Sequence, residues 1–537
     1  MAASLSPVMP PLQQLLPEVA LSDSLAAVLV GGLCLDSRSV KPGDVFVAVP
    51  GLGSDGRDYI SQAFKAGAVA VLAEKNGFKS KFFSSSDSCV VLISELNQQL
   101  SEIAGRFYSD PSDQQVLTGI TGTNGKTTCS LLLAQLFSLI EKSKKPSVGV
   151  IGTLGCGVMT DGSPDFQETG MTTPDAITTQ SILSGYVAQD INRVVMEVSS
   201  HSLVQHRVQA LAFNTAVFTN LSRDHLDYHG DLVSYASAKM QLFAMPGLEH
   251  AVINVDDPVG AEIASQLSPA IELVGYSLTN PNASVYAEGV VLSPQGIAAS
   301  VHTPWGEGEL NSQLIGRFNL QNLLAVISVA CLQGMSFSSV LEALPRLQPV
   351  SGRMERISVE SSIASSIEDS VEGTDKNGAP QVIVDYAHTP DALKNTLETL
   401  REHCDGKLWC VFGCGGDRDQ GKRPLMGEVA IKLADHVVVT SDNPRSEDPE
   451  FIIKDICGGL IADGLDDGLV ESCQVDVVSD REQAINTAIG SADSMDIVLI
   501  AGKGHESYQL IGVQRLPFSD QAQARLALRQ RGGRDDG

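Results

Sequence analysis

Several hallmarks of other protein classes are missing from this 537-residue chain. Its ten cysteines form no CxxC pair and lie beside no histidine cluster, which argues against a zinc site or a disulfide framework. No apolar run approaches the roughly eighteen residues of a membrane span. The N-terminal segment lacks a positively charged stretch leading into an apolar one, so we expect no secretory signal. These absences predict a cytoplasmic protein without a membrane span.

Positive charge is also scarce. Lys and Arg number 37 against 64 Asp and Glu, which gives a formal net charge of −27. Such a chain is a poor general binder of nucleic acid or anionic membranes, so local groups must hold any phosphate-bearing ligand. Apolar residues make up 43% and charged residues 19%, which is typical of a folded globular protein. At roughly 150 residues per domain, the length favours three or four domains.

Alternation of apolar runs with Gly-rich turns predicts an α/β protein of three domains. We expect an α/β module over residues 1–112, a central domain over 113–350 and a C-terminal Rossmann-like α/β domain over 351–537. The central domain begins as strand, Gly-rich loop and helix, the start of a doubly wound sheet of the P-loop ATPase type. The stretch 358–380, rich in Ser, Gly and acidic residues, is predicted to be an exposed loop. Further central strands are expected at 193–198, 215–219 and 251–255.

The loop after the first central strand has the composition of a phosphate-binding loop. Its glycines permit tight turns, so that backbone N–H groups and the next helix N-terminus can face anionic oxygens. Lys126 would reach the β- and γ-phosphates, and a Thr hydroxyl would meet Mg²⁺. Ile120 replaces the first glycine of the usual pattern, and a plain Gly-rich turn is the alternative. The ATP-binding residues predicted here are Thr121, Gly122, Thr123, Asn124, Gly125, Lys126, Thr127 and Thr128.

Polar groups follow two further central strands. Glu197 ends an apolar strand, which places its carboxylate at the sheet edge where ligands bind. By itself it would be interpreted as a solvent-facing side chain, but the nearby phosphate loop favours an Mg²⁺ ligand. Segment 220–229 crowds ionisable side chains into one loop, a density more often functional than structural. Metal, substrate and base roles remain open for these side chains. Lys239, in an expected helix, is by itself typical of a solvated surface charge.

Four polar loops follow apolar strands of the C-terminal domain. They span 385–390, 413–418, 442–445 and 502–506. Each alone is compatible with a plain turn, and for 442–445 a turn is the better interpretation because Asn and Pro favour turns. Four such loops on one sheet edge indicate a ligand site.

The motifs TGTNGKTT, EVSSH, NLSRDHLDYHG, GRFNLQN, DYAHTPDAL, GCGGDRDQGKRP, DNPR and AGKGHE together resemble the Mur ligases of peptidoglycan synthesis. They occur in family order over nearly the whole chain. The resemblance implies three domains, for the UDP part, for ATP and for the incoming amino acid. It also implies a reaction in which ATP phosphorylates a carboxylate, an amine attacks the acyl phosphate and phosphate leaves. The implied small-molecule substrates are UDP-N-acetylmuramoyl-L-Ala-D-Glu and meso-diaminopimelate, and a monomer is expected.

Roles for individual residues follow from the same resemblance. Lys126, Glu197, His225 and Lys239 are implied to be catalytic, and Thr127, Glu197 and Lys239 to hold Mg²⁺. Lys239 is expected to be N6-carboxylated, which turns a cation into a carboxylate-like metal ligand. Asn319 would face adenine. The UDP-sugar-peptide contacts would be Leu35, Ser37, Thr172, Thr173, Ser199, Gln205 and Arg207, and the diaminopimelate contacts Arg418, Asp442, Asn443, Pro444, Arg445, Gly502 and Glu506.

Specificity for the third amino acid has a physical argument. Meso-diaminopimelate carries a second amino-carboxylate centre where L-lysine carries only an ammonium. An Arg at the site would pair with the distal carboxylate of diaminopimelate and repel the ammonium of L-lysine. In the family, DNPR marks the diaminopimelate users, and DNPR with GCGGDRDQGKRP does not suit the related folylpolyglutamate synthetases. A ligase adding L-lysine and a nucleotide-switch ATPase are the alternatives.

The sequence departs from the family pattern at the first UDP-contact loop. There it has Gly51-Leu52-Gly53-Ser54, which lacks the polar side chains that some relatives have at this loop.

Overall fold

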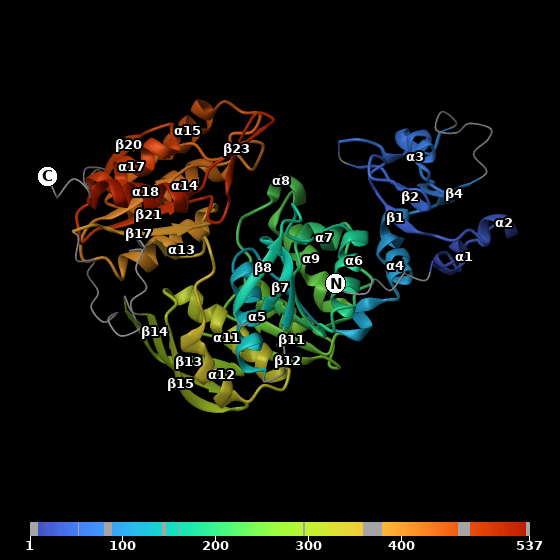
Figure 1. The fold of residues 1–537 in the computed structure, drawn as a ribbon. Coiled ribbons are helices and arrows are strands. Elements are labelled where there is room, and N and C mark those ends of the chain that lie inside the picture. Colours follow the sequence, from blue (N-terminus) through green and yellow to red (C-terminus); the bar gives the residue numbers. More distant parts are fainter. Residues whose placement is uncertain are drawn as a thin grey trace.

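Three α/β bodies make up the molecule (Figure 1). The structure is a computed structural model that describes residues 9–51, 53–79, 89–141, 147–160, 162–293, 296–357, 378–459 and 473–532. The N-terminal and C-terminal bodies lie on either side of the central one in this view, both above it. The predicted exposed loop at 358–380 falls almost entirely outside the described residues. Within the described part of the chain, no helix is long and apolar enough to cross a membrane.

The N-terminal body holds a four-stranded parallel sheet in the order β1-β2-β3-β4. Its elements are α1 (Leu12–Leu15), α2 (Asp23–Ala26), β1 (Gly32–Cys34), β2 (Asp44–Ala48), α3 (Ile60–Ala66), β3 (Ala70–Glu74), β4 (Val90–Ile93) and α4 (Leu96–Tyr108). Helix α4 packs against α6 (Ala176–Val187) of the central body. Ser101 of α4 joins the two bodies, because its hydroxyl accepts from the Ala210 backbone N–H at 3.1 Å.

An eleven-stranded sheet forms the central body, in the order β15-β14-β13-β12-β11-β10-β5-β9-β6-β7-β8. The strands from β13 to β6 in this order pair in parallel, whereas β7, β8, β14 and β15 add antiparallel margins. The strands are β5 (Val116–Thr121), β6 (Ser147–Gly152), β7 (Gly155–Thr160), β8 (Ser163–Gln167), β9 (Arg193–Glu197), β10 (Phe213–Phe218), β11 (His250–Asn254), β12 (Glu272–Ser277), β13 (Val285–Ser293), β14 (Gly296–Thr303) and β15 (Gly306–Ser312). The remaining helices are α5 (Lys126–Ile140), α7 (Ser200–Val204), α8 (Leu226–His229), α9 (Leu232–Met240), α10 (Pro258–Gln266), α11 (Arg317–Leu332) and α12 (Phe337–Ala343).

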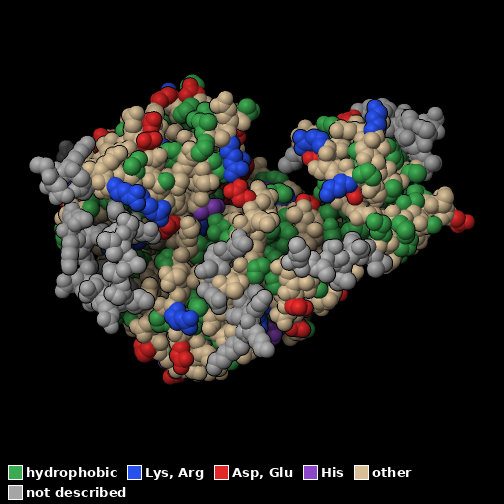
Figure 2. Space-filling model, viewed as in Figure 1, with side chains coloured by type: hydrophobic (Ala, Val, Ile, Leu, Met, Phe, Trp, Pro, Cys, Tyr) green, Lys and Arg blue, Asp and Glu red, His purple; other side chains and the backbone are tan. Residues whose placement is uncertain are grey.

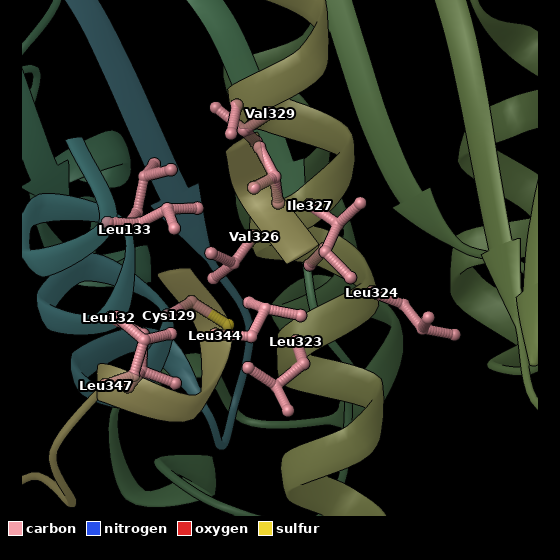
Figure 3. Packing of buried hydrophobic residues seen from close by; sticks show 14 of the residues in the cluster. Cys129, Leu132, Leu133, Leu323, Leu324, Val326, Ile327, Val329, Leu344 and Leu347 are labelled. Carbon is pink, nitrogen blue, oxygen red and sulfur yellow. The ribbon is translucent and has the colours of Figure 1, made fainter. Parts of the chain in front are cut away.

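Helices α5 and α11 pack against each other over one face of this sheet (Figure 3). Leu132 and Leu133 of α5 meet Leu323 and Val326 of α11, and all four are buried. Both helices are apolar on most of their surface because each is enclosed by the sheet and by its neighbour. This core holds the N-terminus of α5, and with it the phosphate-binding loop, rigidly at the carboxyl end of β5.

The C-terminal body has a six-stranded sheet in the order β16-β17-β21-β18-β19-β20, parallel except for β16. A salt bridge at 2.7 Å between Arg481 and Asp520, both fully buried, joins two of its helices. The elements are β16 (Glu355–Ile357), β17 (Gln381–Asp385), α13 (Pro390–Arg401), β18 (Leu408–Phe412), α14 (Lys422–Leu433), β19 (His436–Val439), α15 (Pro449–Gly458), β20 (Gln474–Val477), α17 (Arg481–Ser491), β21 (Ile497–Ala501), the hairpin β22 (Tyr508–Ile511) and β23 (Gln514–Pro517), and α18 (Asp520–Gly532). The predicted fold class, three α/β domains with doubly wound central and C-terminal sheets, is confirmed.

Candidate functional site

The phosphate-binding loop connects β5 to α5 as the sequence predicts. Gly122 and Gly125 have φ values of 150° and 85°, which side-chain-bearing residues rarely adopt. A Cβ on Gly122 would stand 1.9 Å from the Thr219 hydroxyl, so this loop also lies too close to its neighbour for any side chain. Lys126 folds over the loop and donates to the carbonyl oxygens of Gly122 and Thr123 at 2.8 and 2.9 Å. Burial lowers the pKa of Lys126.

Glu197 lies at the carboxyl end of β9, directly beside this loop. The Thr127 hydroxyl donates to Glu197 Oε2 at 3.0 Å, and the backbone N–H and hydroxyl of Thr153 donate to Oε1 and Oε2, both at 2.9 Å. These donors fix the orientation of a carboxylate that is only 1% exposed. Thr127 and Glu197 together present hard oxygen atoms of the kind that Mg²⁺ prefers, next to the loop that would hold phosphates.

Lys239 is not the solvated lysine that its local sequence suggests. Its side chain, on α9, is 1% exposed, and Nζ donates to the Gly122 carbonyl at 2.7 Å. Nζ also lies 4.3 Å from the ring centre of Tyr235. Burial and the nearby charge of Lys126 lower the pKa of Lys239 well below its usual value. Two lysine nitrogens thus share one carbonyl oxygen, an arrangement that disfavours two positive charges.

The crowded loop after β10 places Asp224 between two histidines from different domains. Asp224 Oδ2 lies 3.4 Å from His225 Nε2 and 3.8 Å from Nε2 of His388, which belongs to the C-terminal body. Burial lowers the pKa of both imidazoles, to about 3 for His225 and about 4 for His388. Burial would raise the pKa of Asp224, but the neighbouring histidines and Lys422 hold it below its usual value. At neutral pH, therefore, a carboxylate lies between two neutral imidazoles.

One cavity, of about 450 Å³, opens between the phosphate-binding loop and the C-terminal body. Arg353, which follows the central domain, lines it, donates to the Thr127 hydroxyl at 3.4 Å and stacks on the Tyr386 ring at 4.2 Å. Asn319 does not line this cavity: its side chain is buried and bonds the Ile315 carbonyl and Asn322. Its neighbours Phe318, Gln321 and Asn322 form that part of the wall.

A second cavity, of about 430 Å³, is built from the loops of the C-terminal sheet. The residues expected at the amino-acid site that line it are Arg418, Asp442, Asn443, Arg445, Gly502 and Glu506. Pro444 is buried behind the wall and does not line the cavity. Arg445 Nη1 donates to the Gly416 carbonyl at 2.7 Å, which holds the guanidinium across the loop.

Lys503 contacts the polar and acidic side chains on one side of this second cavity. Its fully buried Nζ donates to Asn443 Oδ1 at 2.9 Å and lies 3.6 and 3.4 Å from the carboxylates of Asp442 and Glu506. Burial would raise the pKa of Asp442, but Lys503 and other cations keep it lowered. Burial and the charge of Asp442 raise the pKa of Glu506. The cavity therefore offers both an anionic group and guanidinium groups to a zwitterionic ligand.

The two cavities have a common boundary, and Thr153, Thr172, Asp224, His225, Tyr386 and His388 line both. Figure 2 shows basic, acidic and histidine side chains gathered where the C-terminal and central bodies face each other, beside the open space that separates the N-terminal and C-terminal bodies. A phosphate group in the first cavity and an amino acid in the second would thus meet at Asp224 and His225.

The residues expected to bind the UDP-sugar-peptide fall into two places. Leu35 and Ser37 lie in the N-terminal body, whereas the other five lie together on the central body. There Arg207 donates to Gln205 Oε1 through Nε at 3.0 Å and to the Thr173 carbonyl at 2.8 Å. Thr172 bonds Thr153 at 3.1 Å, and the Ser199 backbone N–H donates to the Thr173 hydroxyl at 3.0 Å. This hydrogen-bonded group ends at Glu197, because the Thr173 hydroxyl donates to its backbone carbonyl.

Three residues in or beside the two cavities were not singled out from the sequence: His388 and Arg353, which line a cavity, and Lys503, which lies behind the wall of the second. His388 and Lys503 stand inside quoted motifs, DYAHTPDAL and AGKGHE, but their burial and partners depend on which loops meet. Arg353 directly follows the segment 346–352 that looks like a domain boundary. A basic residue at a boundary beside a phosphate-binding fold is the only sequence signal that could have indicated it.

Comparison with known proteins agrees with this geometry. Three family models match, described as Mur ligase family, catalytic domain (residues 30–108), Mur ligase middle domain (120–330) and Mur ligase, glutamate ligase domain (371–504). A UDP-N-acetylmuramoyl-L-alanyl-D-glutamate--2,6-diaminopimelate ligase of Ectopseudomonas mendocina is 46% identical over 96% of this chain and 98% of its own. The ligase of the same name from Coxiella burnetii is 45% identical over 94% and 96%.

Solved structures of ligases are also similar to this chain. A solved UDP-N-acetylmuramoyl-L-alanyl-D-glutamate--2,6-diaminopimelate ligase is similar to this chain with a TM-score of 0.66 at 34% identity, covering 97% of this chain and 99% of its own. A MurF ligase from Thermotoga maritima in complex with ADP shares the fold, with a TM-score of 0.60 at 19% identity over 94% and 98% of the chains. This chain belongs to the Mur ligase family.

Proposed function

We propose that this protein is an ATP-dependent ligase that joins meso-2,6-diaminopimelate to UDP-N-acetylmuramoyl-L-Ala-D-Glu in peptidoglycan precursor synthesis. The observation that carries the proposal is the shared boundary of the two cavities, one at a phosphate-binding loop and one among acidic and guanidinium groups. The names of the relatives from E. mendocina and C. burnetii agree with it. The domains would be residues 1–112 for the UDP part, 113–350 for ATP and 351–537 for the amino acid.

The reaction would pass through an acyl phosphate. A carboxylate lacks a good leaving group until it accepts the γ-phosphoryl group of ATP, after which an amine attacks the acyl carbon and phosphate departs. Lys126 and Arg353, both on the wall of the first cavity, would neutralise the charge that develops on the transferred group. Asp224 and His225 lie where the two substrates would meet, so they would orient the attacking amine.

Mg²⁺ fits the oxygen atoms gathered beside the phosphate-binding loop. Thr127 and Glu197 would hold it together with phosphate oxygens, since Mg²⁺ is usually bound by one or two carboxylates and substrate phosphates. When bound, the metal would withdraw charge from the phosphoryl group.

We further propose that Lys239 is carboxylated on Nζ. In this step the neutral amine attacks carbon dioxide, an N–C bond forms and a proton is released, which leaves a carbamate anion. The lowered pKa of Lys239 favours the neutral amine, and no carboxylate pairs with Nζ among the described residues. The carbamate would relieve the repulsion from Lys126 and supply a second metal ligand.

Selection of the amino acid would depend on Arg445. Its guanidinium lines the second cavity and would pair with the distal carboxylate of diaminopimelate, whereas the ammonium of L-lysine would be repelled. Asp442, Asn443 and Glu506 would bind the distal amino group. On this basis we favour diaminopimelate over L-lysine as substrate.

The remaining expectations complete the proposal. Leu35 and Ser37 would bind the UDP part, while Thr172, Thr173, Ser199, Gln205 and Arg207 would bind the sugar-peptide. The protein would act as a monomer in the cytoplasm, where ATP and UDP-linked precursors occur.

The test is phosphate release by the purified protein with ATP, Mg²⁺ and the UDP-sugar-dipeptide, with diaminopimelate or L-lysine as acceptor and product masses measured. We expect turnover with diaminopimelate, and Arg445→Ala should raise its KM roughly ten- to hundredfold, the effect of one lost charge-assisted hydrogen bond. Preference for L-lysine would overturn the assignment of Arg445. Phosphate release without any acceptor would instead indicate a nucleotide-switch ATPase.

A further inference from the structure

Several imidazole and phenol rings pack together beside the boundary of the two cavities. They come from helices α7, α8 and α9 and from the residue before α8, and α9 packs against both of the other helices on the upper side of the central body (Figure 1). The ring centre of His201 lies 4.2 Å from that of Tyr228, 4.9 Å from His225 and 5.4 Å from His229. His225 lines both cavities, whereas His201 lines neither. His201 is therefore placed to act on ligands through His225 and not by touching them.

The conformation of His225 needs support from its surroundings. Its φ of 54° and ψ of 25° lie in the left-handed region, which a residue with a side chain keeps only where neighbouring contacts hold it. Its side chain is 41% exposed, and Asp224 Oδ2 lies 3.4 Å from its Nε2. The ring of His201 meets the imidazole edge-on, at 86°, while the ring of Tyr235 is farther away at 6.2 Å. Of these two rings, His201 is thus the one that limits rotation of the His225 imidazole more closely.

On its other side, His201 leads to the residues expected to bind the sugar-peptide. The Tyr228 ring packs on it, and Gln205 Nε2 donates to the Tyr228 hydroxyl at 3.0 Å. Gln205 Oε1 in turn accepts from Arg207 Nε at 3.0 Å. A continuous series of contacts therefore runs from the Arg207 guanidinium through Gln205, Tyr228 and His201 to the His225 imidazole.

His201 contributes packing to this series, and neither charge nor a hydrogen bond. Among the described residues, no hydrogen bond or ion pair joins its ring nitrogens to another group. Burial lowers the pKa of His201 to about 4, so the ring is neutral at neutral pH. His229 differs, because its Nε2 is hydrogen-bonded to the Ser200 hydroxyl at 2.9 Å. A phenyl ring, which also packs edge-on, should therefore replace the ring of His201.

Building on the proposed function, we infer that His201 is a positioning residue that orients His225 toward the reacting groups, and that Tyr228 connects this orientation to the bound sugar-peptide. A sugar-peptide that engages Arg207 and Gln205 would hold the Tyr228 hydroxyl, and with it the ring that packs on His201. The His225 imidazole would then be fixed in place when the carboxylate to be activated is present.

Steady-state kinetics of His201 variants provides the first test. His201→Ala should lower kcat about ten- to hundredfold, the effect of a misplaced catalytic group, and leave the KM values for ATP and the amino acid unchanged. His201→Phe should recover most of the rate, because it restores the ring without its nitrogens. The matched control is His302→Ala: this ring stacks on Tyr286 at 4.5 Å in the antiparallel margin, lines neither cavity and should leave kcat unchanged.

Two further measurements ask whether His201 acts through His225. In a His225→Gln background, His201→Ala should lower the residual rate no further, because the group that it orients is gone. In protein with isotope-labelled histidine, the NMR signal of the His225 ring, identified by its loss in His225→Gln, should move in His201→Ala and not in His302→Ala. Added UDP-N-acetylmuramoyl-L-Ala-D-Glu should move the same signal in the wild-type protein, and less in Tyr228→Phe.

The inference is overturned by a wild-type kcat in folded His201→Ala, by independent losses in the double variant, or by a His201→Phe variant as slow as His201→Ala, which would give the ring nitrogens a role. A purely structural role would lower the melting temperature and leave kcat of the folded protein unchanged. An equal response of the His225 signal in the wild type and Tyr228→Phe would overturn the connection to the sugar-peptide.

Tyr228→Phe removes one oxygen atom and keeps every ring contact, so this measurement holds even if His201→Ala does not fold. Failure of the proposed function would show separately, as a wild-type protein without diaminopimelate turnover. The effect of the His201 variants on the His225 signal is measured on the free protein and does not depend on that turnover.

Discussion

At the scale of single residues, the most informative feature is a pair of lysines that donate to the same carbonyl oxygen. Lys126 and Lys239 both donate to Gly122 O, at 2.8 and 2.7 Å. Like charges this close in a buried site raise the free energy of the doubly charged state, which favours loss of a proton from one of the two amines. The fully buried Lys239, whose pKa is lowered well below its usual value, is the better candidate.

Lys239→Ala should therefore lower kcat by about a hundredfold or more, the scale for loss of one charge-stabilising group. Acetate or formate should restore part of the rate, because either supplies the missing carboxylate oxygens. Lys239→Arg serves as the control, since a guanidinium fills the site but forms no carbamate, and it should not respond to added acetate. A carbamate carbon signal in the NMR spectrum of protein incubated with labelled bicarbonate would test the group directly. A fully active Lys239→Ala variant would contradict the proposal.

Single residues also show where local sequence reasoning ends. The phosphate-binding loop is predicted correctly in position, because the strand, glycines and helix that form it are contiguous in the chain. The burial of Lys239 is not, since a helical lysine is ordinarily solvated and its enclosure depends on the Gly-rich loop 117 residues away. Family resemblance supplied its role, and the structure supplies a physical reason for it.

At the scale of elements, the hairpin of β22 and β23 is the least expected feature. Arg515 of β23 stacks on the Tyr508 ring at 3.9 Å and pairs at 3.1 Å with Glu168, which follows β8 of the central body. Arg515 and Glu168 both line the second cavity, and both are more than half exposed. This ion pair therefore bridges two bodies at the mouth of the amino-acid cavity.

We predict that Arg515→Glu raises the KM for the amino acid several-fold. Its effect on the melting temperature should be small, because an exposed ion pair contributes only about 0–1 kcal/mol to stability. The charge-reversed double variant Glu168→Arg/Arg515→Glu should recover most of the affinity. Arg529→Glu, an exposed change on α18, is the matched control. Equal KM values for the single and double variants would show that the ion pair has no part in closing the cavity.

The antiparallel margins β7–β8 and β13–β15 were likewise not predicted from the sequence. Strands β7, β13 and β15 mix exposed and buried positions without a continuous apolar run, as β15 shows with only two of its seven residues buried. The parallel strands β9, β10 and β11 are buried on both faces and appear as uninterrupted apolar segments, so their positions were predicted to within two residues.

At the scale of the whole molecule, the central and C-terminal bodies are in direct contact across the first cavity. Arg223 pairs with Asp419 at 3.3 Å, and Asn124 donates to Asp391 at 3.3 Å. Asp224 with His388 and Glu168 with Arg515 add further polar contacts between these bodies, and the Arg223 and Glu168 pairs are partly exposed. Bodies joined in this way separate at low cost, so bound substrates are expected to contribute to holding them together.

Small-angle scattering should therefore show a smaller radius of gyration when a non-hydrolysable ATP analogue and the sugar-dipeptide are added. Asp419→Arg, which places two guanidinium groups face to face, should oppose this compaction and raise the KM for ATP. Asp405→Arg, an exposed change in the same body, should leave both quantities unchanged. Identical scattering with and without ligands would contradict substrate-driven closure.

Local patterns in the sequence determined the three α/β units and the position of the phosphate-binding loop. They also determined that four polar loops lie on one edge of the C-terminal sheet. These depend on contiguous segments, whose periodicity and turn chemistry act over a few residues. Only the tertiary structure decided that Asp224 faces His388 and that Lys239 and Lys126 share a carbonyl oxygen. Each of these depends on burial and on the approach of segments far apart in the chain, and burial is what sets the free energy of a charge.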